Sequence, residues 1–268
     1  MKIAFKTDII CDMIKKAASI KPKLTIGIIS LYRLKQTMEL LECISESIIN
    51  GLDYEIIILD NNSDNETKTA LMTYAKERDN ITLIFSPFNL RVARSRNLFA
   101  EVAEGDYVMF LDNDLKITPN FIMNMYESVA YRYCINFSKI IEKNRVMTIG
   151  RNIINNRMDC TNDRLALSNP LTWRIRKVDI GPGGSTIFPA SLFKKIKYDS
   201  SLFDHEDWDY CINLKKNYPG VPVLYNPMAT AIHYPTHDLS GEYGKIRRDN
   251  EARDSARQII FDKWGVEC

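Results

Sequence analysis

The sequence lacks the cysteine spacing of a disulfide framework or a zinc site. Its six cysteines stand at positions 11, 43, 134, 160, 211 and 268 and form no CxxC pair. Only three histidines are present. This usage is typical of reduced thiols in a protein that stays in the cytosol, so we expect neither disulfides nor structural zinc.

A membrane-spanning segment is also missing. The longest run without charge, residues 218–237, is broken by Pro219, Pro222, Pro227 and Pro235, and cannot cross a membrane as a helix. The first residues, MKIAFKTDIICDMIKK, have charges too closely spaced for the apolar region of a signal peptide. We therefore predict a cytoplasmic protein, with at most a peripheral association with the membrane.

The chain has little net charge, because 36 Lys and Arg side chains against 34 Asp and Glu give only +2. A balance this even provides no general electrostatic reason to expect nucleic acid as a partner. The 268 residues, 45% of them hydrophobic, are enough for one large α/β domain or two small ones.

Two nucleotide-binding motifs are absent as well. No GxxxxGK[ST] phosphate loop occurs, and the Gly-rich stretch Gly181-Pro-Gly-Gly-Ser185 lacks the third glycine of a dinucleotide fingerprint. An aspartyl-phosphate phosphatase would carry its DxD on the first strand of the sheet, whereas the DxD of this chain follows the fourth predicted strand.

Apolar strands alternate with amphipathic helices through the first half of the chain. We predict strands at residues 23–31, 54–59, 81–85 and 107–111, and helices at 34–48, 64–78, 92–102 and 120–131. This order predicts an α/β fold with a Rossmann-like, mainly parallel central sheet and helices on both faces. Ligands of such sheets bind beyond the carboxyl ends of the strands.

Two carboxylates one residue apart end the fourth predicted strand, in Phe110-Leu-Asp-Asn-Asp-Leu115. Side chains alternate along a strand, so Asp112 and Asp114 would project the same way and repel each other. A cation between them, or a polar ligand on one of them, would explain the pair. The alternative is a solvated turn that caps the next helix.

Several stretches in one order resemble the family 2 glycosyltransferases, which have the A-type glycosyltransferase fold. They are TIGIISLYR (25–33), LDNNSD (59–64), NLRVARSRN (89–97), DND (112–114), GGS (183–185), HEDWD (205–209), AIHY (231–234) and FDKWG (261–265). The resemblance implies a single such domain. In it, residues 23–116 form the nucleotide-sugar-binding half, and residues 117–268 form the acceptor-binding and catalytic half with a C-terminal helical segment. Residues 1–22 are an N-terminal extension outside the resemblance.

The metal-binding residues are those that the resemblance implies. Asp114 would ligate Mn²⁺ or Mg²⁺ directly, and Asp112 would reach the ribose or the metal through water. His233 would be a further ligand, with His237 as the weaker candidate. Such an ion stabilises the departing diphosphate of a sugar donor.

Donor binding is expected at the ends of the first strands. By the resemblance, Asp60 accepts the imide proton of uracil, although an Asx-turn would also explain Asp60. The other donor-binding candidates are Ser30, Tyr32, Arg33, Asn62, Arg91, Arg96, Asp112 and Asn113. Arg91 replaces a glycine usual in the family, and the turn SLYR (30–33) lacks a proline often found there, so recognition of the nucleobase is expected to differ in detail.

Glu206 and Asp207 precede a helical pattern that ends in Lys215-Lys216. This charge order suits a helix dipole, which is a sufficient structural explanation. The functional interpretation is that a carboxylate takes the proton of the acceptor hydroxyl. The resemblance makes Asp207 this base and gives Glu206 an orienting or acceptor-binding role. Gly183, Gly184, Ser185 and Trp208 are the acceptor-binding candidates.

We therefore predict a metal-dependent, inverting glycosyltransferase that uses a nucleoside diphosphate sugar, expected to be a UDP-sugar. Its acceptor is left open among a glycan, a lipid-linked sugar and a peptide. Two alternatives are a catalytically inactive sugar-nucleotide-binding module and a nucleotidyltransferase on a similar sheet. The nucleotidyltransferase would need a glycine-rich, basic loop after the first strand, which Ser30-Leu-Tyr-Arg-Leu-Lys35 does not supply.

Overall fold

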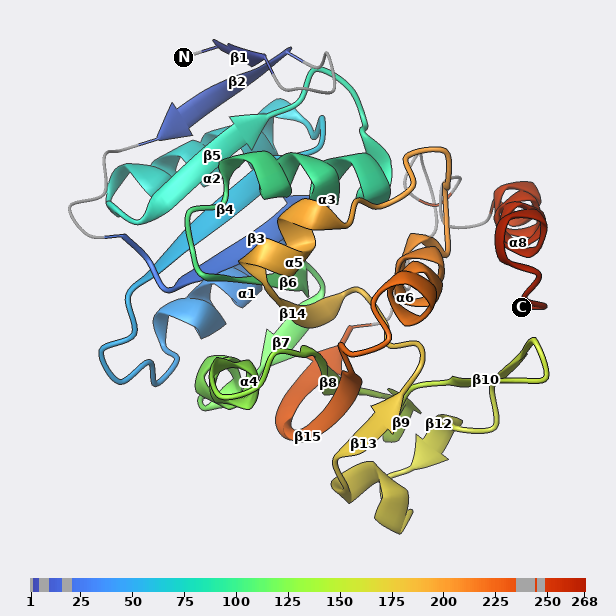
Figure 1. Ribbon diagram of the computed structural model, residues 1–268. Helices are drawn as coiled ribbons and strands as arrows, with labels where there is room; N and C mark the ends of the chain where they lie inside the picture. The colour runs from blue at the N-terminus through green and yellow to red at the C-terminus, as the bar shows by residue number, and fades with distance from the viewer. Residues whose placement is uncertain (1, 5–9, 16–20, 235–243, 245–248) are drawn as a thin grey trace.

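The computed structural model describes residues 2–4, 10–15, 21–234, 244 and 249–268. Strands and helices alternate through its first half, and short strands dominate the second (Figure 1). The strands are β1 (Lys2–Ala4), β2 (Ile10–Lys15), β3 (Leu24–Ser30), β4 (Tyr54–Asp60), β5 (Ile81–Phe85), β6 (Tyr107–Asp112), β7 (Leu115–Ile117), β8 (Ile135–Glu142), β9 (Arg145–Thr148), β10 (Asn152–Ile154), β11 (Arg157–Asp159), β12 (Asp163–Ala166), β13 (Arg176–Val178), β14 (Ser185–Pro189) and β15 (Val223–His233). The helices are α1 (Leu34–Ser45), α2 (Asn65–Lys76), α3 (Arg91–Val102), α4 (Phe121–Ala130), the 3-10 helix η1 (Pro170–Trp173), α5 (Ala190–Lys195), α6 (Glu206–Asn217) and α8 (Asn250–Trp264).

The centre of the sheet is parallel, in the order β5-β4-β3-β6. These strands are nearly continuous apolar runs because both of their faces are covered. Ile57 and Leu59 of β4 belong to one core cluster, together with Phe99 of α3. Ile56 and Ile58 belong to the cluster on the other face, which includes residues of α1, α2 and α4. The prediction of a parallel sheet with helices on both faces is therefore confirmed.

Mixed pairing extends this parallel centre at both edges, because β8 and β15 are parallel to each other whereas the other added pairs are antiparallel. Next to β6 lies β14, followed by β8, β15 and β13, while β2 pairs with β5 at the opposite edge. Cys11 and Met13 of β2 are buried in the same core cluster as Ile57. Part of the predicted N-terminal extension is thus an integral strand of the sheet.

The last described helix, α8, packs near the start of α6. Asp209 of α6 is 1% exposed and accepts hydrogen bonds from Lys263 Nζ (2.9 Å) and Trp264 Nε1 (2.6 Å). A buried carboxylate needs such partners, so this contact fixes α8 against the beginning of α6. None of the described helices combines the length and apolar character needed to cross a bilayer.

Candidate active site

Asp60 lies at the carboxyl end of β4 and is 1% exposed. Both of its carboxylate oxygens accept the backbone N–H of Ser63, at 3.3 and 3.2 Å. These bonds span three residues, one more than in an Asx-turn, and they close the turn from Asp60 to Ser63. Burial raises the pKa of Asp60 above its ordinary value. The same turn is joined to the end of β3, because Tyr32 N–H donates to Ser63 Oγ (2.9 Å).

The turn after β3 has a strained backbone. Tyr32 and Arg33 both adopt left-handed conformations, with φ of 54° and 51°, which side chains other than glycine rarely take. This turn directs the guanidinium of Arg33 onto the carboxylate of Asp114, and both side chains are less than 10% exposed. Ser30 is buried beside Thr37, whose hydroxyl accepts a hydrogen bond from Asn113 Nδ2 (2.9 Å).

Asp112 and Asp114 have different surroundings. The Asp112 side chain is 55% exposed and lies 3.9 Å from the guanidinium of Arg96. Asp114 is buried, and its Oδ2 lies 3.2 Å from His233 Nε2. Burial acts to raise the pKa of Asp114, but the hydrogen bond with His233 and the charge of Arg33 outweigh it and lower that pKa.

His233 is held between two carboxylates. Its Nδ1 lies 2.8 Å from Glu142 Oε2, at the end of β8, while its Nε2 points to Asp114. Burial acts to lower the pKa of His233, but the two carboxylates outweigh it, so the pKa is raised. Sequence reasoning missed Glu142, because nothing in its local sequence indicates a partner 91 residues away.

Asp114 and His233 fit a divalent cation. Asp114 Oδ1 is buried and has no hydrogen-bond partner among the described residues. One orphaned carboxylate oxygen beside an imidazole nitrogen is a donor pair that Mn²⁺ accepts. Asp112 does not join them, and the described part of the chain contains no cluster of three or more potential ligands in metal-binding geometry. His237 lies outside the described residues.

The Gly-rich loop approaches the side chains of Arg96 and Asp112 closely. A Cβ atom on Gly183 would lie 2.3 Å from Arg96 Nη1, and one on Gly184 would lie 2.1 Å from Asp112 Oδ2. Any larger residue would collide at either position. Ser185, the next residue, is buried and its hydroxyl lies 2.5 Å from that of Ser138 in β8.

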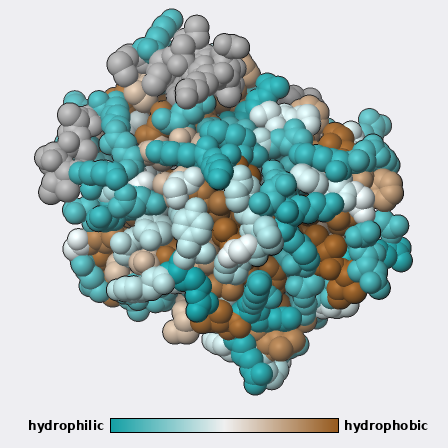
Figure 2. Space-filling view, viewed as in Figure 1, coloured by the Kyte–Doolittle hydropathy of each residue, from teal (hydrophilic) through white to brown (hydrophobic). Residues whose placement is uncertain are grey.

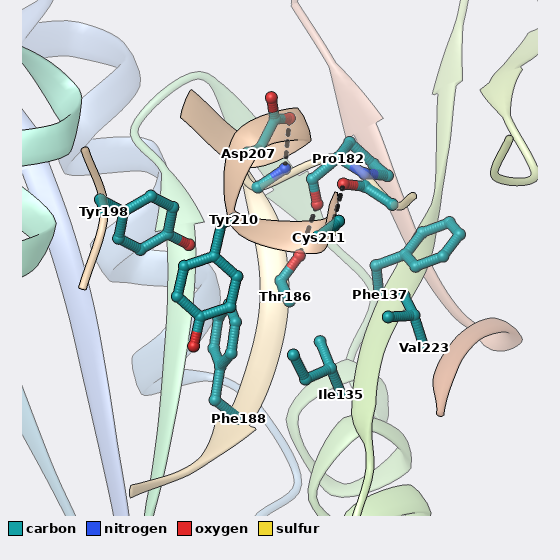
Figure 3. A pocket seen from close by; sticks show the side chains of 12 residues that line it. Ile135, Phe137, Pro182, Thr186, Phe188, Tyr198, Asp207, Tyr210, Cys211 and Val223 are labelled. Carbon is teal, nitrogen blue, oxygen red and sulfur yellow. Dashed lines mark hydrogen bonds between the residues drawn. The ribbon is translucent and has the colours of Figure 1, made fainter. Parts of the chain in front are cut away.

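Glu206 and Asp207 begin α6, after His205 in a left-handed conformation. Glu206 is buried against Arg96, whose Nη1 lies 3.0 Å from Glu206 Oε1. Burial nevertheless raises the pKa of Glu206 to about 7. Asp207 Oδ2 instead accepts the N–H of Gly183 (2.9 Å), as Figure 3 shows at the top of a small cavity behind the loop.

That internal cavity, of about 10 Å³, is lined mainly by apolar and aromatic side chains such as Phe188 and Tyr210 (Figure 3). It has room for about one water molecule and none for a sugar. Asp207 also lines a larger pocket, of about 250 Å³. Its lining residues are Ile140, Met147, Thr148, Arg151, Asp163, Arg164, Pro182, Asp207 and Trp208.

Trp208 forms one wall of this larger pocket and is held rigidly. Its ring stacks on His205 at 3.7 Å between centroids, and the guanidinium of Arg151 lies 4.6 Å from the Trp208 ring. Asp163 holds Arg151 in turn through Nε (3.0 Å) and Nη2 (2.6 Å). Sequence reasoning singled out Trp208 but missed Arg151, which lies just before β10, and Asp163, which begins β12.

The three arginines of NLRVARSRN point in different directions, as their spacing along a helix predicts. Arg96 is 3% exposed and reaches Glu206 and Asp112, whereas Arg94 is exposed on the outer face of α3. Arg91, with φ of 59°, places its guanidinium 4.1 Å from the Phe203 ring. Asn62 is exposed on the turn after Asp60.

A family model described as glycosyl transferase family 2 matches residues 28–196, which is more than half of the chain. The chain belongs to glycosyltransferase family 2. The matched range includes Asp60, Arg96, Asp112, Asp114 and the Gly-rich loop. Family 2 is a family of glycosyltransferase enzymes, so the comparison agrees with the resemblance inferred from the sequence.

Curated relatives match parts of the chain. A poly(ribitol-phosphate) beta-glucosyltransferase of Bacillus spizizenii is 27% identical over 180 residues, covering 64% of this chain and 26% of its own length. An uncharacterised protein of Haemophilus influenzae is 33% identical over 101 residues, covering 36% of this chain and 52% of its own length. The chain thus spans about half or less of the length of these relatives.

Solved structures share the fold. GalNAc-T7 with UDP, GalNAc and Mn²⁺ aligns with a TM-score of 0.66 at 13% identity, covering 93% of this chain and 55% of that one. The mannosyltransferase PcManGT of Pyrobaculum calidifontis, with GDP-Man and Mn²⁺, aligns at 0.64 and 16% identity, covering 91% and 64%. S. aureus TarS 1-349 with UDP-GlcNAc aligns at 0.62 and 16% identity, covering 89% and 65%. The predicted A-type glycosyltransferase fold is confirmed.

Proposed function

We propose that this family 2 protein is a metal-dependent, inverting glycosyltransferase that moves a sugar from a UDP-sugar to an acceptor hydroxyl. Structures with the same fold are complexed with nucleotides or nucleotide sugars, two of them also with Mn²⁺. The buried carboxyl of Asp60, at the end of β4, supports the uridine assignment by offering an acceptor for an imide N–H. The protein would act in the cytoplasm.

Asp114 and His233 would hold the divalent cation, Mn²⁺ or Mg²⁺. Their support is the orphaned Oδ1 of Asp114 beside the imidazole of His233. When bound, the cation would supply Lewis-acid stabilisation of the departing diphosphate. Asp112, which is exposed at the strand end, would bind the ribose, and Arg96 would add positive charge beside it.

Asp207 is the proposed general base, and the observation that supports it most is the difference between the two acidic residues of α6. Asp207 lines the pocket of about 250 Å³, whereas the Glu206 side chain is only 11% exposed and is paired with Arg96. In a single displacement, the acceptor oxygen bonds to the anomeric carbon while the bond from that carbon to the diphosphate breaks. Asp207 takes the hydroxyl proton.

The acceptor would enter the same pocket, against the ring of Trp208 and Pro182 of the Gly-rich loop. Gly183 and Gly184 follow Pro182 in that loop, and Ser185 is fully buried behind it. A rigid aromatic face beside polar groups suits a sugar or polyol. A glycan and a lipid-linked sugar present such a group, and a peptide would instead offer a side-chain hydroxyl. The inactive binding module is disfavoured, because it would not need a carboxylate facing an open pocket.

The deciding experiment compares Asp207→Asn with Glu206→Gln. Loss of proton transfer should lower the transfer rate of Asp207→Asn by roughly a hundred- to ten-thousandfold, with UDP affinity almost unchanged. UDP affinity is measured by calorimetry, and the transfer rate is measured with a panel of nucleotide sugars. A larger rate loss in Glu206→Gln would move the base by one residue, and wild-type rates in both variants would refute the mechanism.

A further inference from the structure

Positive charge is concentrated in one part of the chain. Residues 143–178, from the turn after β8 to the end of β13, contain eight Lys and Arg side chains and two Asp, a net charge of +6, whereas the whole chain carries +2. The rest of the molecule is therefore net acidic. Such a separation creates a field that orients the molecule toward an anionic partner.

The last part of this segment also exposes large apolar side chains. Leu171, Trp173 and Ile175 are 38%, 61% and 65% exposed, within a stretch of seven residues, LTWRIRK. The basic residues of the same stretch lie between and after them. Figure 1 places η1 and β13 at the lower end of the molecule, where Figure 2 shows hydrophobic and hydrophilic side chains next to one another.

Contacts to the sheet hold this stretch in place. Thr172 is fully buried, and its carbonyl accepts the hydroxyl of Tyr225 in β15 (2.9 Å). The Trp173 indole donates Nε1–H to the carbonyl of Leu167 (2.9 Å), and the ring lies 3.6 Å from Lys139 Nζ. These contacts hold the backbone and part of the Trp173 ring in place, while most of the Trp173 and Ile175 side chains stays exposed.

We infer that residues 171–177 dock the protein on a bilayer surface that contains anionic lipid. Tryptophan and leucine flanked by Lys and Arg are the side chains that insert at the boundary between headgroups and acyl chains. Arg174 and Lys177 are exposed and form no ion pair with any described residue, so their charge is available to lipid phosphates. A second copy of this chain is a poor partner, because a twofold contact would bring two such basic surfaces together.

A soluble polyanion is the competing partner, and it would use the arginines without needing the exposed apolar side chains. The inference is independent of the proposed transfer reaction. It also has a functional consequence, because Arg151 and Arg164 of the same basic segment line the pocket beside Asp207. Docking by residues 171–177 would bring that pocket toward acceptors carried by the membrane.

The test measures co-sedimentation of the full chain with vesicles of phosphatidylcholine alone or of phosphatidylcholine with phosphatidylglycerol. Two double variants, Trp173→Ser/Ile175→Ser and Arg174→Gln/Lys177→Gln, address the apolar and the basic contribution. Tyr131→Ser, which alters a side chain that is 92% exposed elsewhere, and Lys35→Gln/Lys76→Gln are the matched controls. Circular dichroism and UDP binding check that each variant is folded.

We expect binding to the anionic vesicles only, and at least a tenfold weaker affinity in each of the two test variants but in neither control. UDP binding and donor hydrolysis should stay unchanged in all four, so a failure of docking is separable from a failure of the proposed function. Equal binding by wild type and both test variants would overturn the inference. Loss of binding in the charge variant alone, with competition by soluble polyphosphate, would assign the surface to a soluble polyanion instead.

Discussion

At the scale of single residues, the buried carboxyl of Glu206 should make the stability of the protein depend on pH. The pKa of Glu206 is raised to about 7 from an ordinary value of 4.5. The folded protein therefore binds this proton more tightly than the unfolded chain, and the stability it contributes is lost as pH rises through the folded pKa. We expect wild type to lose roughly 1–3 kcal/mol between about pH 5 and pH 8 relative to Glu206→Gln.

Urea unfolding of both proteins across this pH range measures the difference. Every other titratable group is shared by the two proteins, so its contribution cancels in the comparison. Parallel curves of unfolding free energy against pH would show that Glu206 is ionised throughout in the folded state.

Glu142 is expected to control metal affinity without touching the metal. When His233 is neutral with its proton on Nδ1, Glu142 accepts that N–H and fixes the ring. The Nε2 lone pair, beside Asp114, is then directed to where the ion would bind. Glu142→Ala should weaken Mn²⁺ binding in the presence of UDP by roughly ten- to a hundredfold, measured by calorimetry.

Arg164→Gln is the matched control, because Arg164 contacts the other oxygen of Glu142 at 3.4 Å but does not touch His233. Its Mn²⁺ affinity should stay close to that of wild type. If Glu142→Ala binds Mn²⁺ as wild type does, then His233 needs no partner to keep its orientation, or is not a ligand.

At the scale of elements, the Gly-rich loop before β14 is expected to set the position of Asp112. A methyl group at Gly184 would lie 2.1 Å from Asp112 Oδ2, and this exposed side chain must then move. Gly184→Ala should lower UDP-sugar affinity by roughly ten- to a hundredfold, because displaced donor-binding groups lose their alignment. Melting temperature should change little.

Gly220→Ala provides the comparison, since a methyl group there would meet no atom within 4 Å. Titration of both variants with a UDP-sugar in the presence of Mn²⁺ measures the effect. Equal affinity in the two variants would mean that Asp112 is not held by the loop.

The first half of the fold was predictable from sequence because the apolar residues of each element there follow one clear pattern, either a continuous strand run or a helical spacing. The strand expected at 81–85 is β5 as observed, and the helices expected at 92–102 and 120–131 differ from α3 and α4 by a residue or so. Apolar strands covered on both faces and helices with one apolar face give signals that do not depend on distant partners.

The second half was not predictable in the same way. Strands such as β7 and β14 are short, and their pairing partners, β15 and β6, lie far away in sequence. Distance along the sequence also explains which residues of the site were missed. The family motifs predict positions such as Asp207, whereas Glu142 and Arg151 were missed because only the folded chain brings them to His233 and Trp208.

At the scale of the whole molecule, the sheet begins with residues that the family resemblance excluded. Strand β2 pairs antiparallel with β5, with Met13 opposite Ile84 and Ile14 opposite Leu83. Alternation along the strand buries Met13, which is 6% exposed, and leaves Ile14 46% exposed. A slip of one residue would exchange the two environments, so the register of β2 can be tested with a single pair of variants.

Met13→Asp should destabilise the protein by about 3 kcal/mol or more, because it places a carboxylate without a partner in the core cluster that contains Ile57 and Ile84. Ile14→Asp introduces the same group on the same strand, but at a half-exposed position, and should cost less than about 1 kcal/mol. Urea unfolding of both variants measures the difference, and UDP affinity reports whether the edge of the sheet affects the donor site. Equal and small losses would show that β2 does not contribute to the core. A larger loss at Ile14 than at Met13 would place the strand one residue out of the described register, with Cys11 then turned to solvent as well.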